Sequence, residues 1–277
     1  MNNLSDTRRK KFKIEVSHDI DSVFKFKFEN GKNVLKQSIG DLIKRKDPIQ
    51  FFWRPTIWLL VKIGFVKYDP FNTFNFIYKV SKELNLQNTF YFIVGKSSVD
   101  KEGRYEINNR HVKKLLKRIH QEGHSIGLHP SYNTYLNQLV LEKELIRLRY
   151  ILEELSIDQE LIGARMHYLR WKQPDTLRIS DKIGLHHSST MGYAQFPGFR
   201  AGTCFSYQGF DAVHQRKLNI RIKPLVFMDV TGLSKKYLNL KYSEIITVTN
   251  YLKSNCKKVE GTFSILWHNS QLDTKAK

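Results

Sequence analysis

The chain has little of what would mark a disulfide-rich, fibrous or membrane-spanning protein. Its 277 residues include 2 cysteines, Cys204 and Cys256, which form neither a disulfide framework nor a CxxC pair and are expected to be reduced thiols. The 15 glycines and 7 prolines are too few for a fibrous or disordered chain. An apolar stretch over 51–66 is interrupted by charged residues and a proline, so it is too short to cross a membrane. It could still lie on a membrane or form a wall of a binding cleft.

Acidic residues are scarce beside basic ones: 46 Lys and Arg stand against 26 Asp and Glu, for a formal net charge of +20. This balance predicts a partner with negative charge, and nucleic acid, an anionic membrane face and an acidic polysaccharide all fit it. The basic residues are spread along the chain without a nucleic-acid motif, so we expect no nucleic acid as partner. Residues 1–11 form a basic tail with no apolar segment behind it, so we expect no secretory signal and a cytoplasmic protein.

Strand-like and helix-like patterns alternate along the rest of the chain, except between the first strand and residue 69, where no pattern is clear. No linker rich in Pro, Gly or Ser divides it, so we expect a single α/β domain of parallel βα units over 12–277. In such folds the chemistry gathers at the carboxyl ends of the strands. The expected strands cover 12–16, 89–94, 125–128, 162–164, 218–229 and 262–267, and the expected helices cover 74–80, 112–119, 139–155, 174–183 and 242–253.

Five short strings carry most of the groups suited to catalysis. They are SHDID at 17–21, GHSIGLHPSYNT at 123–134, RMHYLRW at 165–171, GFRAGT at 198–203 and LWHN at 266–269. All but the fourth come directly after an expected strand, which agrees with a common site. In this order the strings resemble those of the polysaccharide deacetylase superfamily, the metal-dependent carbohydrate esterases of family four, and a bacterial branch of it in particular. The resemblance runs from about Lys13 to Ser270.

The resemblance implies a distorted, incomplete (β/α) barrel that removes N-acetyl groups from sugar polymers. In the family one divalent metal, commonly zinc, is held by an aspartate and two histidines. Matched to this sequence, Asp19 is the expected base and Asp21 a metal ligand, Arg165 orients the base, and His268 is the general acid. Residues two apart on a strand face the same side, so both carboxylates can point into one site, although taken alone they would fit a pair of surface aspartates.

His129 is the strongest candidate for a further metal ligand. The family's usual second histidine, four residues later, is replaced here by Asn133, whose carbonyl oxygen is a weaker ligand than imidazole. We expect Asn133 to complete the site, with His18, His124 or His167 as the alternatives.

Contacts with a sugar are expected from the remaining positions of the strings. The backbone near Tyr168 is expected to help bind an oxyanion, as that region does in the family. Arg200 is suited to bind an anionic group of a glycan or to pair with a structural carboxylate. Trp171 and Trp267 are suited to stack on a sugar or to pack in the core. The family's aspartate near the acid histidine has no counterpart in 187–193, so the partner of His268 is open. The expected substrate-binding residues are His167, Tyr168, Trp171, Arg200 and Trp267.

The resemblance therefore implies a metal-dependent hydrolase, with zinc as the expected ion. It would remove N-acetyl groups from a bacterial surface or capsular polysaccharide or its precursor, a glycan that can carry negative charge. Two alternatives stay open: a weakened relative that binds glycan without hydrolysis, and a hydrolase of another amide or imide on the same scaffold. Peripheral contact with an anionic membrane is also compatible with the charge.

Overall fold

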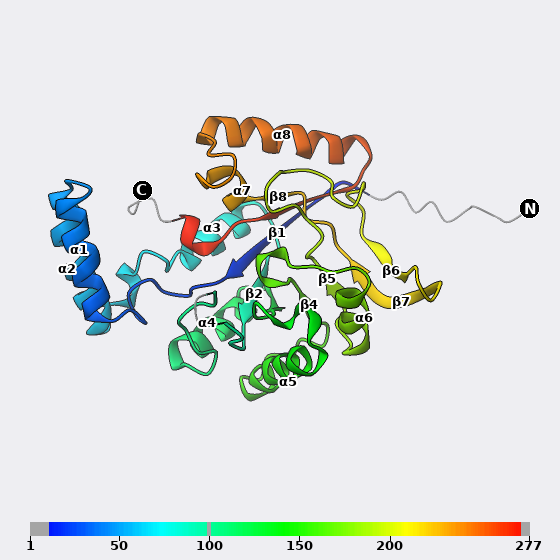
Figure 1. Cartoon of the computed structure of the whole chain (residues 1–277), viewed down its shortest axis with the longest axis horizontal. Coiled ribbons are helices and arrows are strands. Elements are labelled where there is room, and N and C mark those ends of the chain that lie inside the picture. The colour runs from blue at the N-terminus through cyan, green and yellow to red at the C-terminus, as the bar shows by residue number, and fades with distance from the viewer. Residues whose placement is uncertain (1–10, 99–100, 273–277) are drawn as a thin grey trace, which may run out of the picture.

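The computed structural model describes residues 11–98 and 101–272, and the strands of these residues form one sheet (Figure 1). Their order across the sheet is β6-β7-β5-β4-β3-β2-β1-β9-β8, and all neighbouring strands are parallel except β6 and β7. The end strands β6 and β8 are not paired with each other, so the barrel is incomplete. The strands are β1 (Lys13–Ile20), β2 (Thr89–Ile93), β3 (Ser125–His129), β4 (Gly163–Ala164), β5 (His187–Ser188), β6 (Tyr207–Asp211), β7 (Arg216–Ile222), β8 (Phe227–Met228) and β9 (Thr262–Leu266).

Helices cover the outside of this sheet, with α8 along one side and α4, α5 and α6 along the other (Figure 1). The amphipathic α4 shows why: Val112, Leu116 and Ile119 recur at helical spacing and are buried in the main core. A second apolar cluster lies under α8 and includes Phe263 of β9. The helices are α1 (Gly31–Ile43), α2 (Pro48–Lys62), α3 (Phe74–Glu83), α4 (Arg110–Gln121), α5 (Gln138–Glu154), α6 (Asp175–Lys182), α7 (Asp229–Leu233) and α8 (Tyr242–Lys258).

The predicted α/β fold of an incomplete barrel is confirmed, with local differences. The run over 218–229 was expected to be one strand, but it divides into β7, β8 and the start of α7. Pro224 lies at the break, and proline has no N–H to donate to a strand ladder. The antiparallel hairpin of β6 and β7 was not expected, and the segment without a clear pattern forms the helical pair α1 and α2. Most of the basic tail expected over 1–11 lies outside the described residues.

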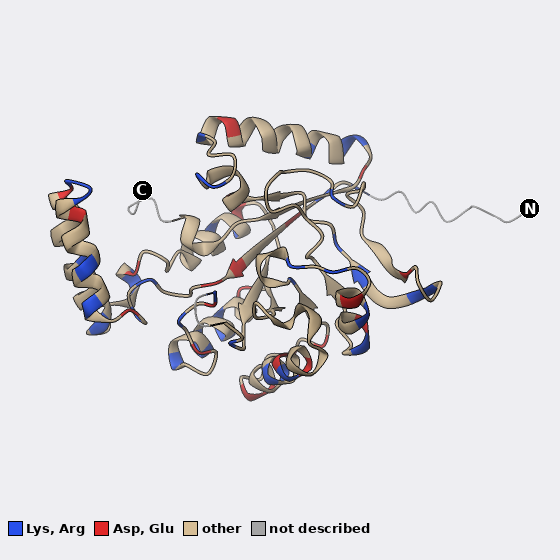
Figure 2. Ribbon diagram, viewed as in Figure 1, with Lys and Arg blue, Asp and Glu red and all other residues tan. Residues whose placement is uncertain are grey.

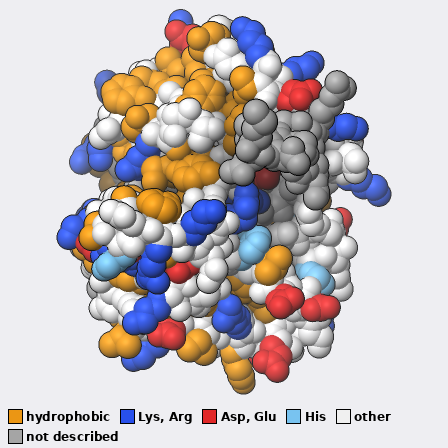
Figure 3. Space-filling model, turned by 90° about the vertical axis from the view of Figure 1, so that its right-hand side faces the viewer, with side chains coloured by type: hydrophobic (Ala, Val, Ile, Leu, Met, Phe, Trp, Pro, Cys, Tyr) orange, Lys and Arg blue, Asp and Glu red, His pale blue; other side chains and the backbone are white. Residues whose placement is uncertain are grey.

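Charged side chains are distributed over the whole molecule. Figure 2 shows Lys and Arg on the α1–α2 pair, on α4 to α6 and around the hairpin of β6 and β7. At the end of the molecule that Figure 3 faces, Lys and Arg lie at several separate places, while hydrophobic side chains gather in the upper part. Both cysteines are buried and free. Among the described residues, no helix combines the length and the hydropathy that crossing a bilayer would need.

Candidate metal centre and active site

The carboxyl ends of four parallel strands bring together polar groups that are far apart in the sequence. Asp19 and Asp21 lie at the end of β1, His129 is the last residue of β3, and Arg165 directly follows β4. The registers pair Ile93 with His129 and Leu128 with Ala164, so these strands end at one edge of the sheet. His268 follows β9, the neighbour of β1 on its other side.

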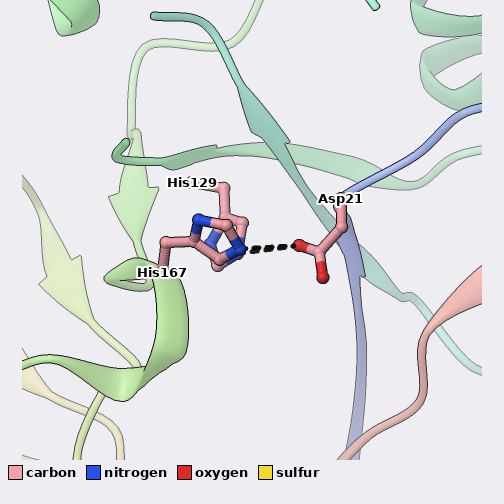
Figure 4. A group of neighbouring side chains, drawn as sticks. All are labelled: Asp21, His129 and His167. Carbon is pink, nitrogen blue, oxygen red and sulfur yellow. Dashed lines mark ion pairs between the residues drawn. The ribbon is translucent and has the colours of Figure 1, made fainter. Parts of the chain in front are cut away.

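Asp21, His129 and His167 form a cluster able to hold a metal ion (Figure 4). The Nε2 atom of His129 lies 3.3 Å from Asp21 Oδ1, and Nε2 of His167 lies 3.5 Å from the same oxygen. One ligand atom from each residue fits within 4.8 Å of the others. A carboxylate with two imidazoles is a donor set typical of zinc and other divalent transition metals.

The hydrogen bonds around these side chains leave the atoms that would bind a metal facing one another. His129 Nδ1 lies 2.5 Å from the backbone oxygen of Arg165, which directs Nε2 towards Asp21, as is usual for metal-binding histidines. Asp21 Oδ1 is buried and has no hydrogen-bond partner within the described part of the chain. A buried carboxylate oxygen without a partner is costly, and a bound cation would satisfy it. The residues present therefore fit a divalent metal.

The charges in the cluster are strongly coupled. Burial would raise the pKa of Asp21, but its interactions with His129, His268 and His167 hold that pKa well below its usual value. Burial would lower the pKa of His129, but the carboxylates of Asp19 and Asp21 raise it overall. Burial and the charge of His129 lower the pKa of His167 to about 4. Without metal, His167 is therefore neutral at neutral pH, the state in which an imidazole binds a metal.

Asp19 is held by an arginine buried beside it. Arg165 Nη1 donates to Asp19 Oδ1 at 2.8 Å and to Ser17 Oγ at 2.9 Å, and its other nitrogens donate to Ser189. The guanidinium also lies 4.6 Å from the ring centre of Tyr91. The free oxygen, Asp19 Oδ2, lies 3.8 Å from His129 Nε2. Arg165 thus fixes the carboxylate and leaves one oxygen facing the metal cluster.

His268 has an acidic partner that sequence reasoning missed. Asp229, the first residue of α7, accepts from the backbone N–H of His268 and lies 2.7 Å from its ring Nδ1. Burial would lower the pKa of His268, but Asp229, helped by Asp21, raises it to about 10. The other ring nitrogen, Nε2, faces Asp21 Oδ2 at 3.7 Å. A signal was present in the sequence, because Asp229 ends the apolar run over 218–229, whereas the acid was expected within 187–193.

The three other candidate ligands are engaged elsewhere. The Asn133 amide donates to the backbone oxygen of Ser97 and accepts from Arg170, and it is not beside Asp21. His18 contacts the Trp267 backbone oxygen and the Asn88 amide, and His124 Nδ1 accepts from the Asn88 backbone N–H. His167, expected mainly as a substrate contact, is the residue that lies with Asp21 and His129.

A cavity of about 210 Å³ opens onto the cluster. Beside the ionisable groups it is lined by apolar side chains from several segments of the chain, and by the exposed Tyr168, which has an unusual φ of +58°. Trp171, Arg200 and Trp267 do not line this cavity. The indole of Trp171 donates to Gln173, Arg200 donates to the Gly192 backbone oxygen, and Trp267 packs beside the α8 cluster. The lining residues are Asp19, Asp21, His129, His167, Tyr168, Leu169, Ala194, Met228, Val230, Tyr237 and His268.

Several solved structures have a similar fold. A "putative polysaccharide deacetylase" from Mycobacterium smegmatis matches with a TM-score of 0.58 and 13% identity, over 94% of this chain and 78% of that one. The Puue allantoinase matches with a TM-score of 0.55 and 11% identity, over 97% of this chain and 82% of that one. A "probable Polysaccharide deacetylase" from Pseudomonas aeruginosa PAO1 matches with a TM-score of 0.53 and 12% identity, over 96% and 80%.

No family model matches the sequence, and no curated protein matches it. The similarity to known proteins is therefore a similarity of fold. The chain has the fold of the solved polysaccharide deacetylases along nearly its whole length, as the resemblance in its strings implied.

Proposed function

We propose that this protein is a metal-dependent deacetylase that hydrolyses N-acetyl groups of a glycan. The observation that carries the proposal is the convergence of Asp21, His129 and His167 between two buried acid–base pairs. A metal cluster alone would fit many functions. A metal cluster with a carboxylate on one side and a protonated imidazole on the other supplies what amide hydrolysis needs.

Asp19 would act as the base. A divalent cation held by the three ligands would supply Lewis acidity and make a water molecule acidic enough to lose a proton near neutral pH. Asp19 Oδ2 takes that proton, because Oδ1 is occupied by Arg165 and Oδ2 faces the cluster. Once it has lost this proton, the water oxygen would bond to the carbonyl carbon of the acetamido group, and the π electrons of the C=O bond would move to the carbonyl oxygen.

His268 would act as the acid. The amine leaves only after it gains a proton, because an amide anion is a very poor leaving group. His268 is protonated at neutral pH and presents Nε2 to the cavity, since Asp229 binds Nδ1. As the C–N bond breaks, the amine nitrogen receives the proton from Nε2 and acetate is formed. The left-handed backbone at Tyr168 and Leu169 borders the cavity and is a candidate support for the developing oxyanion.

We propose a bacterial surface or capsular polysaccharide or its precursor as the glycan, zinc as the ion and the cytoplasm as the location. The strings of the sequence and the named activity of two neighbours of similar fold support the glycan. The net charge of +20 suits a glycan with negative charge. Arg200, Trp171 and Trp267 lie away from the catalytic cavity, so any sugar contact by them would concern more distant units of a polymer.

Hydrolysis of another amide or imide is the second candidate function. The similarity in fold to the Puue allantoinase favours it, because a protein of that name has this fold and the groups proposed here could act on another amide as well. The non-hydrolytic alternative is weaker. It was based on Asn133 and on the missing acid, whereas His167 lies beside Asp21 and His129, and Asp229 lies 2.7 Å from the His268 ring.

The test combines metal binding with product analysis. We expect the purified protein to bind one divalent ion, to release acetate from N-acetylglucosamine oligomers and to lose this activity with a chelator. His167→Ala should weaken metal binding by about 100-fold or more, since it removes a ligand, while the matched Asn133→Ala should leave it unchanged. Consumption of allantoin without acetate release would favour the second candidate. Failure to take up metal, or equal loss in both variants, would refute the proposed site.

A further inference from the structure

The helices α1 and α2 form a hairpin that stands apart from the barrel (Figure 1). The two helices pack mainly against each other, and a small core of their own holds them together. This core contains Phe26, Val34 and Val61, with tryptophans from α2 packed against it. The hairpin therefore contributes little to the barrel core, and its outer surface calls for another explanation.

The outer surface carries two apolar stripes. On α2 and its C-cap, Ile49, Phe52, Leu59 and Ile63 follow one helical face, and Ile49 and Phe52 are 77% and 67% exposed. On α1, a second stripe is exposed and consists of Leu35, Ile39 and Leu42. Single exposed apolar residues are ordinary, but stripes on both helices of one projecting element indicate an interaction surface.

The exposed charged side chains of the hairpin are mostly basic. Its carboxylates are engaged within the protein: Asp41 pairs with the buried Arg54 at 2.7 Å, and Asp47 caps α2. Asp69, just beyond the hairpin, accepts backbone N–H groups of 25–27. Asp41 also pairs with Arg45, so among the described residues no ion pair balances the other exposed basic side chains of the hairpin. The exposed basic residues of the hairpin and of the segment that follows it are Lys32, Lys36, Lys44, Arg45, Lys46, Lys62 and Lys67.

We propose that the α1–α2 hairpin docks onto a lipid bilayer rich in anionic headgroups. Apolar stripes with flanking lysines are what an element lying in the membrane interface requires: the apolar side chains enter the acyl boundary and the ammonium groups meet the headgroups. A nucleic acid would use the lysines but leave the stripes exposed. A second copy would bring two basic tips together, which repel each other.

The position of the hairpin gives such docking a consequence for the site. In Figure 1, β1 points towards the hairpin, and the chain passes from Asp21 directly into the segment that leads to α1. The hairpin thus lies on the side of the molecule to which the catalytic ends of the strands point. Docking would hold this end of the barrel at the membrane, where lipid-linked substrates are found. The docking itself does not depend on the proposed chemistry, so each can fail without the other.

The experiment is co-sedimentation of the full chain with vesicles. We expect binding to phosphatidylcholine vesicles that contain phosphatidylglycerol, weaker binding to phosphatidylcholine alone, and a decrease with added salt. The variant Ile49→Ser/Phe52→Ser/Leu59→Ser should bind about tenfold more weakly or worse, because it loses apolar area that enters the bilayer. Lys44→Gln/Lys46→Gln should bind about 30-fold more weakly, since each of the two basic residues near the surface contributes about 1 kcal/mol.

A matched control lies on α5. Leu139→Ser/Ile146→Ser/Tyr150→Ser removes a stripe of similar exposure and should bind vesicles like the unaltered protein. All the altered side chains are exposed, so the melting temperature should stay the same. Should a variant fail to fold, quenching of the hairpin tryptophans by brominated lipid reports insertion in the unaltered protein. Absence of binding to anionic vesicles, or equal loss in the α5 variant, would overturn the proposal. So would hairpin variants that only change a dimer into a monomer.

Discussion

Two buried ion pairs flank Asp21, and they present opposite charges to the metal cluster. On one side Arg165 Nη1 binds Asp19 at 2.8 Å, and on the other Asp229 binds the ring of His268 at 2.7 Å. In the first pair the carboxylate faces the cluster and the cation lies behind it. In the second pair the cation faces the cluster and the carboxylate lies behind it.

The difference shows how similar pairs are given different roles. A guanidinium keeps its charge in proteins, so Arg165 is suited to hold the Asp19 carboxylate in place at any working pH. An imidazole does titrate, and Asp229 keeps His268 protonated to well above neutral pH. One pair is therefore suited to accept a proton and the other to donate one. The predictions below change one member of a pair at a time.

The largest effect is expected for the two residues that face the cluster. Asp19→Asn and His268→Ala should each lower kcat by about 10²- to 10⁴-fold, because each removes one proton-transfer step. Bound metal should remain near the level of the unaltered protein, because neither residue belongs to the Asp21, His129 and His167 set. Acetate release and metal content measured on the same preparation check both points.

The control for this pair of variants is Trp171→Phe, outside the cavity, which should release acetate at the original rate from a short oligomer. Turnover close to that of the unaltered protein in either variant would remove that residue from the mechanism. Loss of metal in both would mean that they support the site rather than transfer protons.

A smaller effect is expected for the residue behind His268. Asp229→Asn should lower kcat by about 10- to 100-fold, the usual cost of losing a group that orients a functional side chain. Asp229 raises the pKa of His268, so the variant should have a lower pKa there. Because the acid must be protonated, the alkaline limb of the kcat profile should move to lower pH. If kcat falls at every pH and the alkaline limb stays at the same pH, Asp229 has only a structural role.

The ionisable side chains that line the cavity were predicted from the sequence better than the partners that bind them. Asp19, Asp21, His129 and His268 each end or follow a strand, and parallel strands bring such ends together whatever their distance in sequence. Asp229 also follows a strand, but this strand, β8, has only two residues. In the sequence β8 cannot be told apart from the longer apolar run that contains Pro224. The pairing of a carboxylate with an imidazole depends on how distant segments pack across the sheet, and a local sequence pattern does not predict such packing.

The third position of the metal cluster shows the same limit. Asn133 was favoured because it stands four residues after His129, where the family that the strings resemble usually has its second histidine. The chain instead turns away after Ser131, and the Asn133 amide is bound by Ser97 and Arg170. His167 comes from the loop after β4, the neighbour of β3 in the sheet. Spacing along the chain is a poor guide where the ligands come from different strands.

The fold was predicted well where strands are buried and poorly where apolar residues are exposed. β2 and β3 read as strands because their apolar runs are buried. The hairpin of α1 and α2 gave no clear pattern, since its apolar residues cover an outer face as well as an inner one. A helix that is apolar on both faces has no single amphipathic period to detect.

The smallest effect is on stability, and it separates the two pairs by their response to pH. In the folded, metal-free protein the pKa of His268 is about 10, against an ordinary value of 6.5. A group whose pKa rises on folding stabilises the folded state fully below the unfolded value, and that stabilisation is lost as the pH rises through the folded value. Arg165 carries the same charge throughout this window, so its pair adds no such slope. With a chelator present, the melting temperature should therefore fall between pH 6.5 and about 10 more steeply than in His268→Gln, which lacks the titrating ring. Parallel curves for the two proteins would show that Asp229 does not hold a proton on His268.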